Sequence, residues 1–319
     1  MRAICYSDYG TPDVLEPADL PTPVRRRGQV LIRVVAAGIN PIDYRTRQGQ
    51  LKWLLPGGFP RVPGFDVAGR VAECDQDCGL RVGDRVLAFL DSPRGGGYAE
   101  FALASTRFVV PIPDGLDSVA AGGLPLAGST VLQAYHGTIV PGRGDSVLVN
   151  GASGGVGSLA VQIAKAYGAS VTGVASGKQL DFVRELGADE TIDYETTDFT
   201  RLGADWQLVF DVAGNRTFGE TRAALAERGT FVSTEPSFRG LIRHAATAFS
   251  RRKAKFVLAQ PQRPILDELV RLVADGRLHV PVDRVYPLEE AATAHRHLEA
   301  GGVRGKLVLR VAENDMHDS

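Results

Sequence analysis

The chain has 319 residues, 44% of them hydrophobic, and its 36 basic and 37 acidic side chains give a formal net charge of -1. This balance argues against nucleic acid or an anionic membrane surface as a partner, and no apolar run is long enough to cross a bilayer. The length predicts two domains. The three cysteines are an odd and sparse set, and the chain starts without the apolar core of a secretory signal, so we expect reduced thiols and a cytoplasmic protein.

The first third of the chain has the pattern of a β-barrel. Strand-like runs occur at Val30–Val35, Val67–Ala72, Arg85–Phe89 and Tyr98–Ala104, and turns rich in Pro and Gly separate them. Many short strands with such turns are typical of an all-β domain. We therefore expect a barrel before an α/β pattern begins after Pro125.

An apolar segment at residues 50–59 stands out within this region. Its sequence is Q-L-K-W-L-L-P-G-G-F, and we expect Trp53 and Leu54 to line the substrate pocket, because pocket walls are commonly apolar. A short helix packed on the barrel is an equally good interpretation, because Leu51, Leu54 and Leu55 have helical spacing.

The most informative motif is the run N-G-A-S-G-G-V-G at residues 150–157. A buried-strand pattern at residues 147–149 precedes it, and an amphipathic helical pattern follows it and ends at Gly168. Glycines at such a turn let the backbone approach a pyrophosphate, and the N–H groups at the helix start face the anion. A nucleoside-triphosphate loop would need the sequence Gly-Lys-Ser or Gly-Lys-Thr at its end. Here Gly155 is followed by Val156 and not by a lysine. We therefore predict a dinucleotide site.

The choice of dinucleotide depends on the residues after the next strand, which we predict at Ser170–Ala175. An NAD-preferring site would have an acid there to bind the ribose hydroxyls. This chain has Ser176 and Lys178, and a hydroxyl with an ammonium would stabilise a 2'-phosphate. NADPH is therefore the expected cofactor, with a solvated loop lysine as the alternative for Lys178.

Two further strands are predicted in the same sheet, at Leu208–Asp211 and Thr230–Ser233. In an open parallel sheet, ligands bind at the carboxyl ends of the strands. This rule is expected to place Asp211, Ala213, Gly214 and Ser233 near the cofactor.

The last part of the chain contains an edge strand and a return to the barrel. The apolar run at Lys255–Ala259 predicts an exposed sheet edge, which invites pairing with a second copy and hence a homodimer. Helices are expected at Pro264–Ala274 and Leu288–Ala300, and a closing strand at Lys306–Val311.

Eight segments of this chain, taken in order, form a recognisable set. They are AAGINPIDYRTRQG (36–49), PGFDVAGRV (63–71), VGDRV (82–86), GGYAEF (96–101), LPLAGSTVLQA (124–134), NGASGGVG (150–157), LGADETIDY (186–194) and RGKLVL (304–309). Together they resemble the medium-chain dehydrogenase/reductase superfamily, and within it the zinc-free quinone oxidoreductase branch that includes zeta-crystallin.

The resemblance implies an α/β fold with two domains. A GroES-like β-barrel catalytic domain would comprise residues 1–125 and 263–319, the latter ending in a polar tail. A Rossmann domain with a doubly wound parallel sheet would bind NADP(H) at residues 126–262.

The predicted cofactor-binding residues come from the glycine turn, from the loop after the second strand and from positions that match the family. They are Thr130, Gly151, Ser153, Gly154, Gly155, Val156, Gly157, Ser176, Lys178, Tyr194, Ala213, Gly214, Ser233 and Lys306. By resemblance, Tyr194 would lie at the adenosine end, and Thr130 and Lys306 towards the nicotinamide.

The zinc ligands of the related alcohol dehydrogenases are missing. Those enzymes have Cys where this chain has Asn40, and Gly-His-Glu where it has Gly64-Phe65-Asp66; no Cys follows Cys78. We therefore expect no metal, and hydride transfer to an already electrophilic acceptor. Asn40 and Tyr44 are the candidate catalytic residues, as donors to the developing enolate or quinol oxygen. A turn residue bonded to its own backbone is an equally good interpretation of Asn40.

The sequence as a whole predicts an NADPH-dependent, zinc-independent oxidoreductase that transfers hydride to a quinone or a related conjugated carbonyl. One alternative is a 2-enoyl thioester or enone reductase of lipid or polyketide metabolism, which uses the same hydride chemistry. A second is a non-catalytic NADPH-binding sensor. A small-molecule electrophile is the expected partner in the first two cases.

Overall fold

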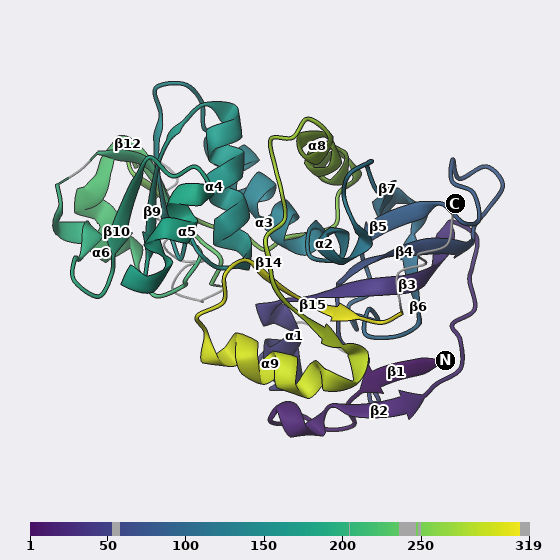
Figure 1. The fold of residues 1–319 in the computed structure, drawn as a ribbon. Coiled ribbons are helices and arrows are strands. Elements are labelled where there is room, and N and C mark those ends of the chain that lie inside the picture. Colours follow the sequence, from purple (N-terminus) through teal and green to yellow (C-terminus); the bar gives the residue numbers. More distant parts are fainter. Residues whose placement is uncertain (53–57, 204, 236–246, 248–249, 313–319) are drawn as a thin grey trace. The chain divides into compact units, whose positions relative to one another are not determined.

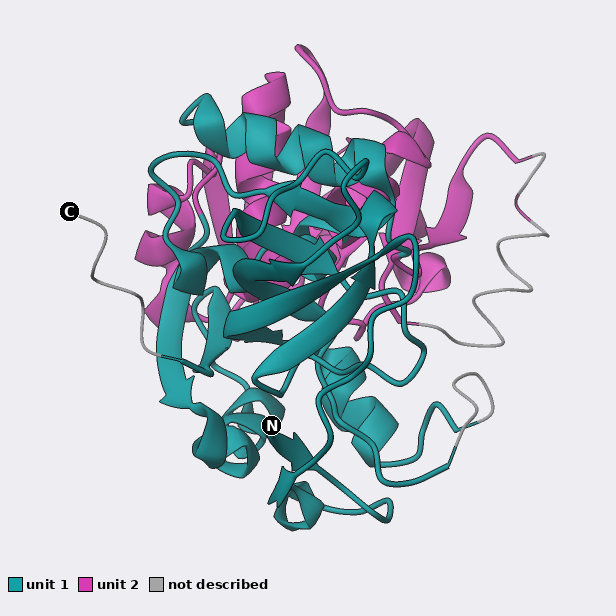
Figure 2. Ribbon diagram, turned by 90° about the vertical axis from the view of Figure 1, so that its right-hand side faces the viewer, with its two compact units in different colours: residues 1–129, 260–276, 280–319 teal, residues 130–259, 277–279 magenta. Residues whose placement is uncertain are grey.

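The structure is a computed structural model, and it describes residues 1–52, 58–203, 205–235, 247 and 250–312 (Figure 1). The contacts divide the chain into two compact units (Figure 2). Unit 1 comprises residues 1–129, 260–276 and 280–319, and unit 2 comprises residues 130–259 and 277–279. Trp53 and Leu54, the predicted pocket residues, lie outside the described residues.

The described part of unit 1 is built around a mostly antiparallel sheet of seven strands. The order is β14 (Val282–Pro287), β15 (Lys306–Arg310), β3 (Gln29–Ile39), β4 (Asp66–Glu73), β5 (Arg85–Phe89) and β7 (Val109–Pro111), with β6 (Phe101–Ser105) also paired to β3. Only β14 and β15 run parallel. A second, small sheet pairs β1 (Arg2–Cys5) with β2 (Glu16–Asp19). The strand β15 pairs antiparallel with β3, so the end of the chain joins the sheet formed by its start.

Short helices complete unit 1. They are α1 (Pro41–Arg47), α2 (Ser118–Gly122), α8 (Arg263–Ala274), α9 (Ala291–Ala300), the first part of α3 (Pro125–His136), and the 3-10 turns η1 (Pro12–Val14), η2 (Thr106–Phe108) and η6 (Leu288–Glu290). The core joins alternate strand residues such as Val34 and Val67 to Ala291 and Ala294 of α9. The alternation follows from the period of two in a strand, which sends successive side chains to opposite faces.

Unit 2 contains the doubly wound parallel sheet that the sequence predicts. Its six described strands are β10 (Glu190–Asp193), β9 (Ser170–Ala175), β8 (Ser146–Asn150), β11 (Trp206–Asp211), β12 (Leu225–Ser233) and β13 (Lys253–Phe256), in that spatial order. Every neighbouring pair is parallel. The strand order therefore reverses between β8 and β11, which is where a doubly wound sheet binds its ligand. The edge strand β13 begins at Lys253, two residues before the predicted start at Lys255.

The helices of unit 2 include the one that follows the glycine turn. They are α4 (Gly155–Tyr167), α5 (Leu180–Glu185), α6 (Phe218–Thr221), the second part of α3, and the 3-10 turns η3 (Gly177–Gln179), η4 (Phe199–Arg201) and η5 (Arg222–Ala224). Fully buried Leu148 and Val209 from the central strands join a core cluster with Phe199 and Trp206, whose rings meet edge to face at 6.2 Å.

Among the described helices, none combines the length and apolar character that a bilayer span requires.

Candidate functional site

The glycine turn of unit 2 is shaped by close backbone contacts. Gly151 has φ +87°, a left-handed conformation that favours glycine. A Cβ on Gly157 would lie 2.0 Å from the carbonyl oxygen of Gly151, so no side chain fits there. A Cβ on Gly154 would meet only that same oxygen, at 3.6 Å. Gly151 and Gly157 are thus required by the fold, whereas Gly154 leaves its surroundings open.

The start of α4 has the donors that an anion needs. Gly154 is the N-cap residue, and Ser158 N–H donates to its carbonyl oxygen at 2.8 Å. Within the described residues, no backbone carbonyl accepts from the N–H groups of Gly155, Val156 and Gly157. Three amides at a helix N-terminus form a binding site for a phosphate group. These residues therefore fit the pyrophosphate of a dinucleotide.

A buried carboxylate holds the neighbouring loop against this turn. Asp211, at the end of β11, accepts hydrogen bonds from Asn150 Nδ2 at 2.8 Å and from Gly214 N–H at 3.1 Å. Its pKa is raised by burial, and these donors oppose the shift. Ala213 N–H donates to the carbonyl oxygen of Asn150 at 3.1 Å. The predicted residues Ala213 and Gly214 are therefore brought beside the glycine turn. Sequence reasoning did not single out Asn150, although it begins the motif.

One glutamine joins the two predicted parts of the cofactor site. The hydroxyls of Ser153 and Ser176 both donate to Oε1 of Gln179, at 2.8 and 3.2 Å. Ser153 belongs to the glycine turn and Ser176 follows β9, so the two segments share a single acceptor. Gln179 is buried, and the sequence analysis missed it because no motif spacing distinguishes it.

The loop predicted to bind the 2'-phosphate has an acid beside it. Lys178 is exposed, and an ideal Cβ on Gly177 would lie 2.8 Å from Oδ2 of Asp193. The residues directly after β9 do not reveal this acid, because Asp193 ends the adjacent strand β10, in register with Ala175. Tyr194 follows it, 57% exposed. The loop thus combines a hydroxyl and an ammonium with a nearby carboxylate.

The remaining predicted cofactor residues fall into different settings. Ser233 ends β12 and is half-buried, and its Oγ accepts from Glu235 N–H at 3.1 Å. Thr130 is buried on α3, at the first position of unit 2. Lys306 belongs to unit 1, where it meets a predicted catalytic residue.

In unit 1, Asn40 and Lys306 lie in one buried polar cluster. Asn40 is the N-cap residue of α1. Its Oδ1 accepts from Lys306 Nζ at 2.6 Å, and its Nδ2 donates to Asp66 Oδ2 at 2.9 Å. Lys306 Nζ also donates to the carbonyl oxygen of Ile39, at 3.1 Å. The side chain of Asn40 therefore connects an ammonium to a carboxylate. It also forms a capping box with Asp43 at the start of α1, as the interpretation of Asn40 as a local turn residue expects. Tyr44, the other catalytic candidate, is half-buried on the same helix.

A second carboxylate completes this cluster. Asp43 Oδ2 accepts from the backbone N–H of Asn40 at 2.7 Å, and Oδ1 accepts from Gly64 N–H at 3.1 Å. Burial raises the pKa of Asp43 to about 7 and that of Asp66 to about 6. Burial also lowers the pKa of Lys306, and the two carboxylates oppose that shift. Three ionisable groups thus share a site that excludes water, and their protonation states depend on one another.

A chain of hydrogen bonds leads from Asp43 to the surface. Tyr98 Oη lies 3.3 Å from Asp43 Oδ2 and 3.2 Å from His295 Nε2. Arg47 Nε donates to His295 Nδ1 at 3.4 Å, so the ring proton of a neutral imidazole belongs on Nε2. Burial lowers the pKa of His295 to about 3, which keeps the ring neutral. Arg47 pairs with Glu299, which is partly exposed. The sequence alone does not reveal this chain of contacts, because its partners are far apart in the chain.

The described carboxylates of this cluster are not arranged as metal ligands. Within the part of the chain that the structure describes, no group of three or more His, Cys, Asp and Glu side chains is arranged to hold a metal ion. Phe65 stands between Gly64 and Asp66 and supplies no ligand atom.

Two family descriptions match separate parts of the chain. Residues 26–114 match the alcohol dehydrogenase GroES-like domain, and residues 186–309 match the zinc-binding dehydrogenase family. Together they cover segments of both units.

Curated relatives match the chain along nearly its whole length. The chloroplast envelope quinone oxidoreductase homolog of Arabidopsis thaliana is 33% identical over 97% of this chain and 98% of that protein. The NADPH-dependent alkenal/one oxidoreductase of the same plant is 34% identical over 97% of this chain and 79% of that protein. Among solved structures, the quinone oxidoreductase from Coxiella burnetii has a TM-score of 0.90 and 36% identity, covering 98% of this chain and 99% of that one.

Proposed function

The chain belongs to the medium-chain dehydrogenase/reductase superfamily, in its quinone oxidoreductase branch, and from this membership we propose that it transfers hydride from NADPH to a quinone or a related conjugated carbonyl. The observation that carries the proposal is the glycine turn, with three amides at the start of α4 that donate to no backbone carbonyl among the described residues. The bound nicotinamide supplies the hydride. The protein supplies binding, orientation and electrostatic stabilisation.

In this proposal, backbone amides bind the pyrophosphate of the cofactor, and side chains bind its 2'-phosphate. The amides of Gly155, Val156 and Gly157 bind the pyrophosphate. Ser176 and Lys178 bind the 2'-phosphate, and this contact selects NADPH over NADH. The single hydrogen of the Ser176 hydroxyl is directed at Gln179, so it must turn from the amide to the phosphate on binding.

Tyr44 is our proposed donor to the acceptor oxygen, which gains negative charge as hydride arrives. Asn40 has a different proposed part, because its amide oxygen and nitrogen are already bonded to Lys306 and Asp66. It orients the Lys306 ammonium, and that cation stabilises developing negative charge in a site of low dielectric. Solvent supplies the proton that completes the reduction.

The acceptor class is tested by steady-state rates on a panel. Naphthoquinone, a simple enone and crotonyl thioester are each given with NADPH and with NADH. The proposal expects the highest kcat/KM for the quinone with NADPH. A higher value for crotonyl thioester would instead support a 2-enoyl reductase, which the similarity to an alkenal/one oxidoreductase favours as the second candidate. Tight NADPH binding without turnover of any acceptor would support a non-catalytic sensor.

We also propose a homodimer that forms through the edge of the unit 2 sheet. β13 is the last strand of that sheet among the described residues, and a sheet edge can pair with a second copy. Thr247 Oγ1 already accepts from Ala254 N–H at 2.9 Å, so a second copy must displace this hydroxyl or pair beyond it. A monomer by sedimentation at micromolar concentration would contradict the proposal.

The cytoplasm remains our proposed location, supported by three cysteines without disulfide bonds.

A further inference from the structure

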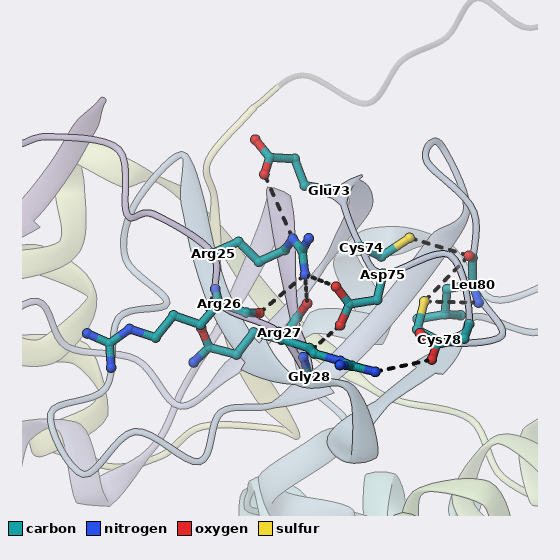
Figure 3. Close-up of polar contacts among 11 residues, drawn as sticks. Arg25, Arg26, Arg27, Gly28, Glu73, Cys74, Asp75, Cys78 and Leu80 are labelled. Carbon is teal, nitrogen blue, oxygen red and sulfur yellow. Dashed lines mark hydrogen bonds and ion pairs between the residues drawn. The ribbon is translucent and has the colours of Figure 1, made fainter.

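Two cysteines of unit 1 meet in a turn that has no part in the proposed function. Cys74 directly follows β4. Cys78 N–H donates to the carbonyl oxygen of Asp75 at 3.2 Å, and this turn brings Cys78 back towards Cys74. The sulfur atoms of both residues hydrogen bond to the carbonyl oxygen of Leu80, at 3.4 and 3.5 Å (Figure 3). The two thiols therefore converge on one point, and both are partly exposed.

The turn is held in place by ionic and apolar contacts. The Asp75 carboxylate accepts from Arg25 at 2.5 Å and from Gly28 N–H at 2.7 Å (Figure 3). Cys74 and Leu80 pack against the apolar core of unit 1. Because these contacts fix the backbone on both sides of the turn, both thiols are held beside the Leu80 carbonyl oxygen.

The two thiols have different environments. Burial raises the pKa of the Cys74 thiol, and a hydrogen bond to Cys78 raises it further. The backbone N–H of Leu80 donates to Cys78 Sγ at 3.4 Å, which stabilises negative charge on that sulfur. This N–H contact favours Cys78 as the attacking sulfur, with the Cys74 thiol beside it.

We propose that Cys74 and Cys78 form an oxidative modification site, a dithiol that hydrogen peroxide converts into a disulfide within the turn. In the first step, the Cys78 thiolate attacks a peroxide oxygen; an S–O bond forms, the O–O bond breaks, and hydroxide leaves and takes a proton as water. In the second step, Cys74 sulfur attacks Cys78 sulfur; the S–S bond forms, the S–O bond breaks, and a second water leaves. The thiols lose two electrons, and the peroxide is reduced to water. This site is independent of the proposed function.

Peptide mass analysis of the full chain tests the proposal. Trypsin cleaves after Arg70 and Arg81, so both cysteines lie in the single peptide 71–81. After hydrogen peroxide treatment, unfolding and alkylation, we expect this peptide to lack alkyl groups and to be lighter by both thiol hydrogens. Dithiothreitol should restore alkylation, and buried Cys5 should be alkylated throughout. Two alkylated cysteines in peptide 71–81, or disulfides between chains, would overturn the proposal.

Single variants test the order of the steps. Cys74→Ser leaves Cys78 without a resolving thiol, so a sulfenic acid should accumulate that dimedone traps. Cys78→Ser leaves the thiol with the raised pKa, and peroxide should consume it about tenfold more slowly. Cys5→Ser is the control and should still form the disulfide. Equal rates in the two single variants would overturn the assignment of Cys78 as the attacking thiol.

Discussion

Lys306 Nζ lies 2.6 Å from Asn40 Oδ1, and this bond joins residues that are 266 positions apart in the chain. It exists because β15 pairs antiparallel with β3, with Leu307 opposite Ile39. The position at which zinc alcohol dehydrogenases have a cysteine ligand thus belongs to an ammonium–amide–carboxylate chain, in which Asn40 also donates to Asp66.

Replacing Asn40 should destabilise the protein. Asn40→Ala leaves Lys306 and Asp66 buried without their shared partner, and the free energy of unfolding should fall by about 1–3 kcal/mol. Chemical denaturation monitored by circular dichroism measures the change. The exposed residue Gln76 is the control, and Gln76→Ala should leave stability unchanged. An equally stable Asn40→Ala variant would show that the amide has no role in holding the cluster.

The stability of the protein should depend on the ionisation of Asp43. In the unfolded chain this carboxyl loses its proton near its ordinary pKa of 3.8, but in the folded chain it does so only near about 7. Between these values the folded state binds more protons, so stability falls as pH rises. The contribution is fully present below about pH 4 and is lost above about pH 7.

The test compares unfolding free energies of the wild type and Asp43→Asn between pH 4 and pH 8. The difference between the two proteins should change with pH in the direction given above, because the amide does not titrate. Measuring the difference removes the contribution of acids whose pKa is lowered, such as Asp75. A difference that is constant over this range would contradict the raised pKa.

Lys178 should determine the preference between the two nicotinamide cofactors. Lys178→Ala should weaken NADPH binding by about 1–3 kcal/mol and leave NADH nearly unchanged. Isothermal titration measures both. Lys165 pairs with Asp189 elsewhere in unit 2, so Lys165→Ala is a matched control that should alter neither affinity. Equal losses for both cofactors would assign Lys178 a structural role only.

Asp193 should have the opposite effect at the same loop. Its carboxylate lies beside Gly177 and repels a 2'-phosphate. Asp193→Asn removes the charge and keeps an oxygen that can accept from Glu195 N–H, as the carboxylate does at 2.9 Å. The ratio of NADPH affinity to NADH affinity should therefore rise by a few-fold. An unchanged ratio would mean that the carboxylate does not reach the phosphate.

Substitutions of two glycines in the turn should have different effects, one on stability and the other on cofactor binding. Gly157→Ala places a Cβ where the Gly151 carbonyl oxygen lies, so it should lower stability by about 1–3 kcal/mol. Gly154→Ala meets only an ordinary contact and should keep the melting temperature, but its methyl group blocks the approach of the pyrophosphate. We expect it to weaken NADPH and NADH alike. Unchanged binding in Gly154→Ala would show that the pyrophosphate does not bind at this turn.

The sequence predicts the parts of the molecule that local patterns determine. The strand, glycine turn and helix around Gly154 are contiguous, and their periodicity distinguishes a buried strand from an amphipathic helix. The parallel sheet follows from repeating strand and helix patterns. Asp211 was placed near the cofactor because strand ends gather at one edge of such a sheet.

The parts that were missed depend on pairing between distant segments. His295 meets Tyr98 and Arg47 only because α9 packs against α1 and β3 within unit 1, and these partners are 197 and 248 positions away. Asp193 reaches the Ser176 loop because β10 lies beside β9. Gln179 has no motif spacing, and its role depends on two serine side chains that the fold brings to one oxygen.

The most direct test of the proposed function is the rate of NADPH oxidation as naphthoquinone concentration is varied, with cofactor deuterated at the transferred position as a comparison. We expect saturable turnover that slows on deuteration, is faster with NADPH than with NADH, and is reduced in the folded Gly154→Ala variant. No oxidation of either cofactor above the rate without enzyme would contradict hydride transfer to a quinone.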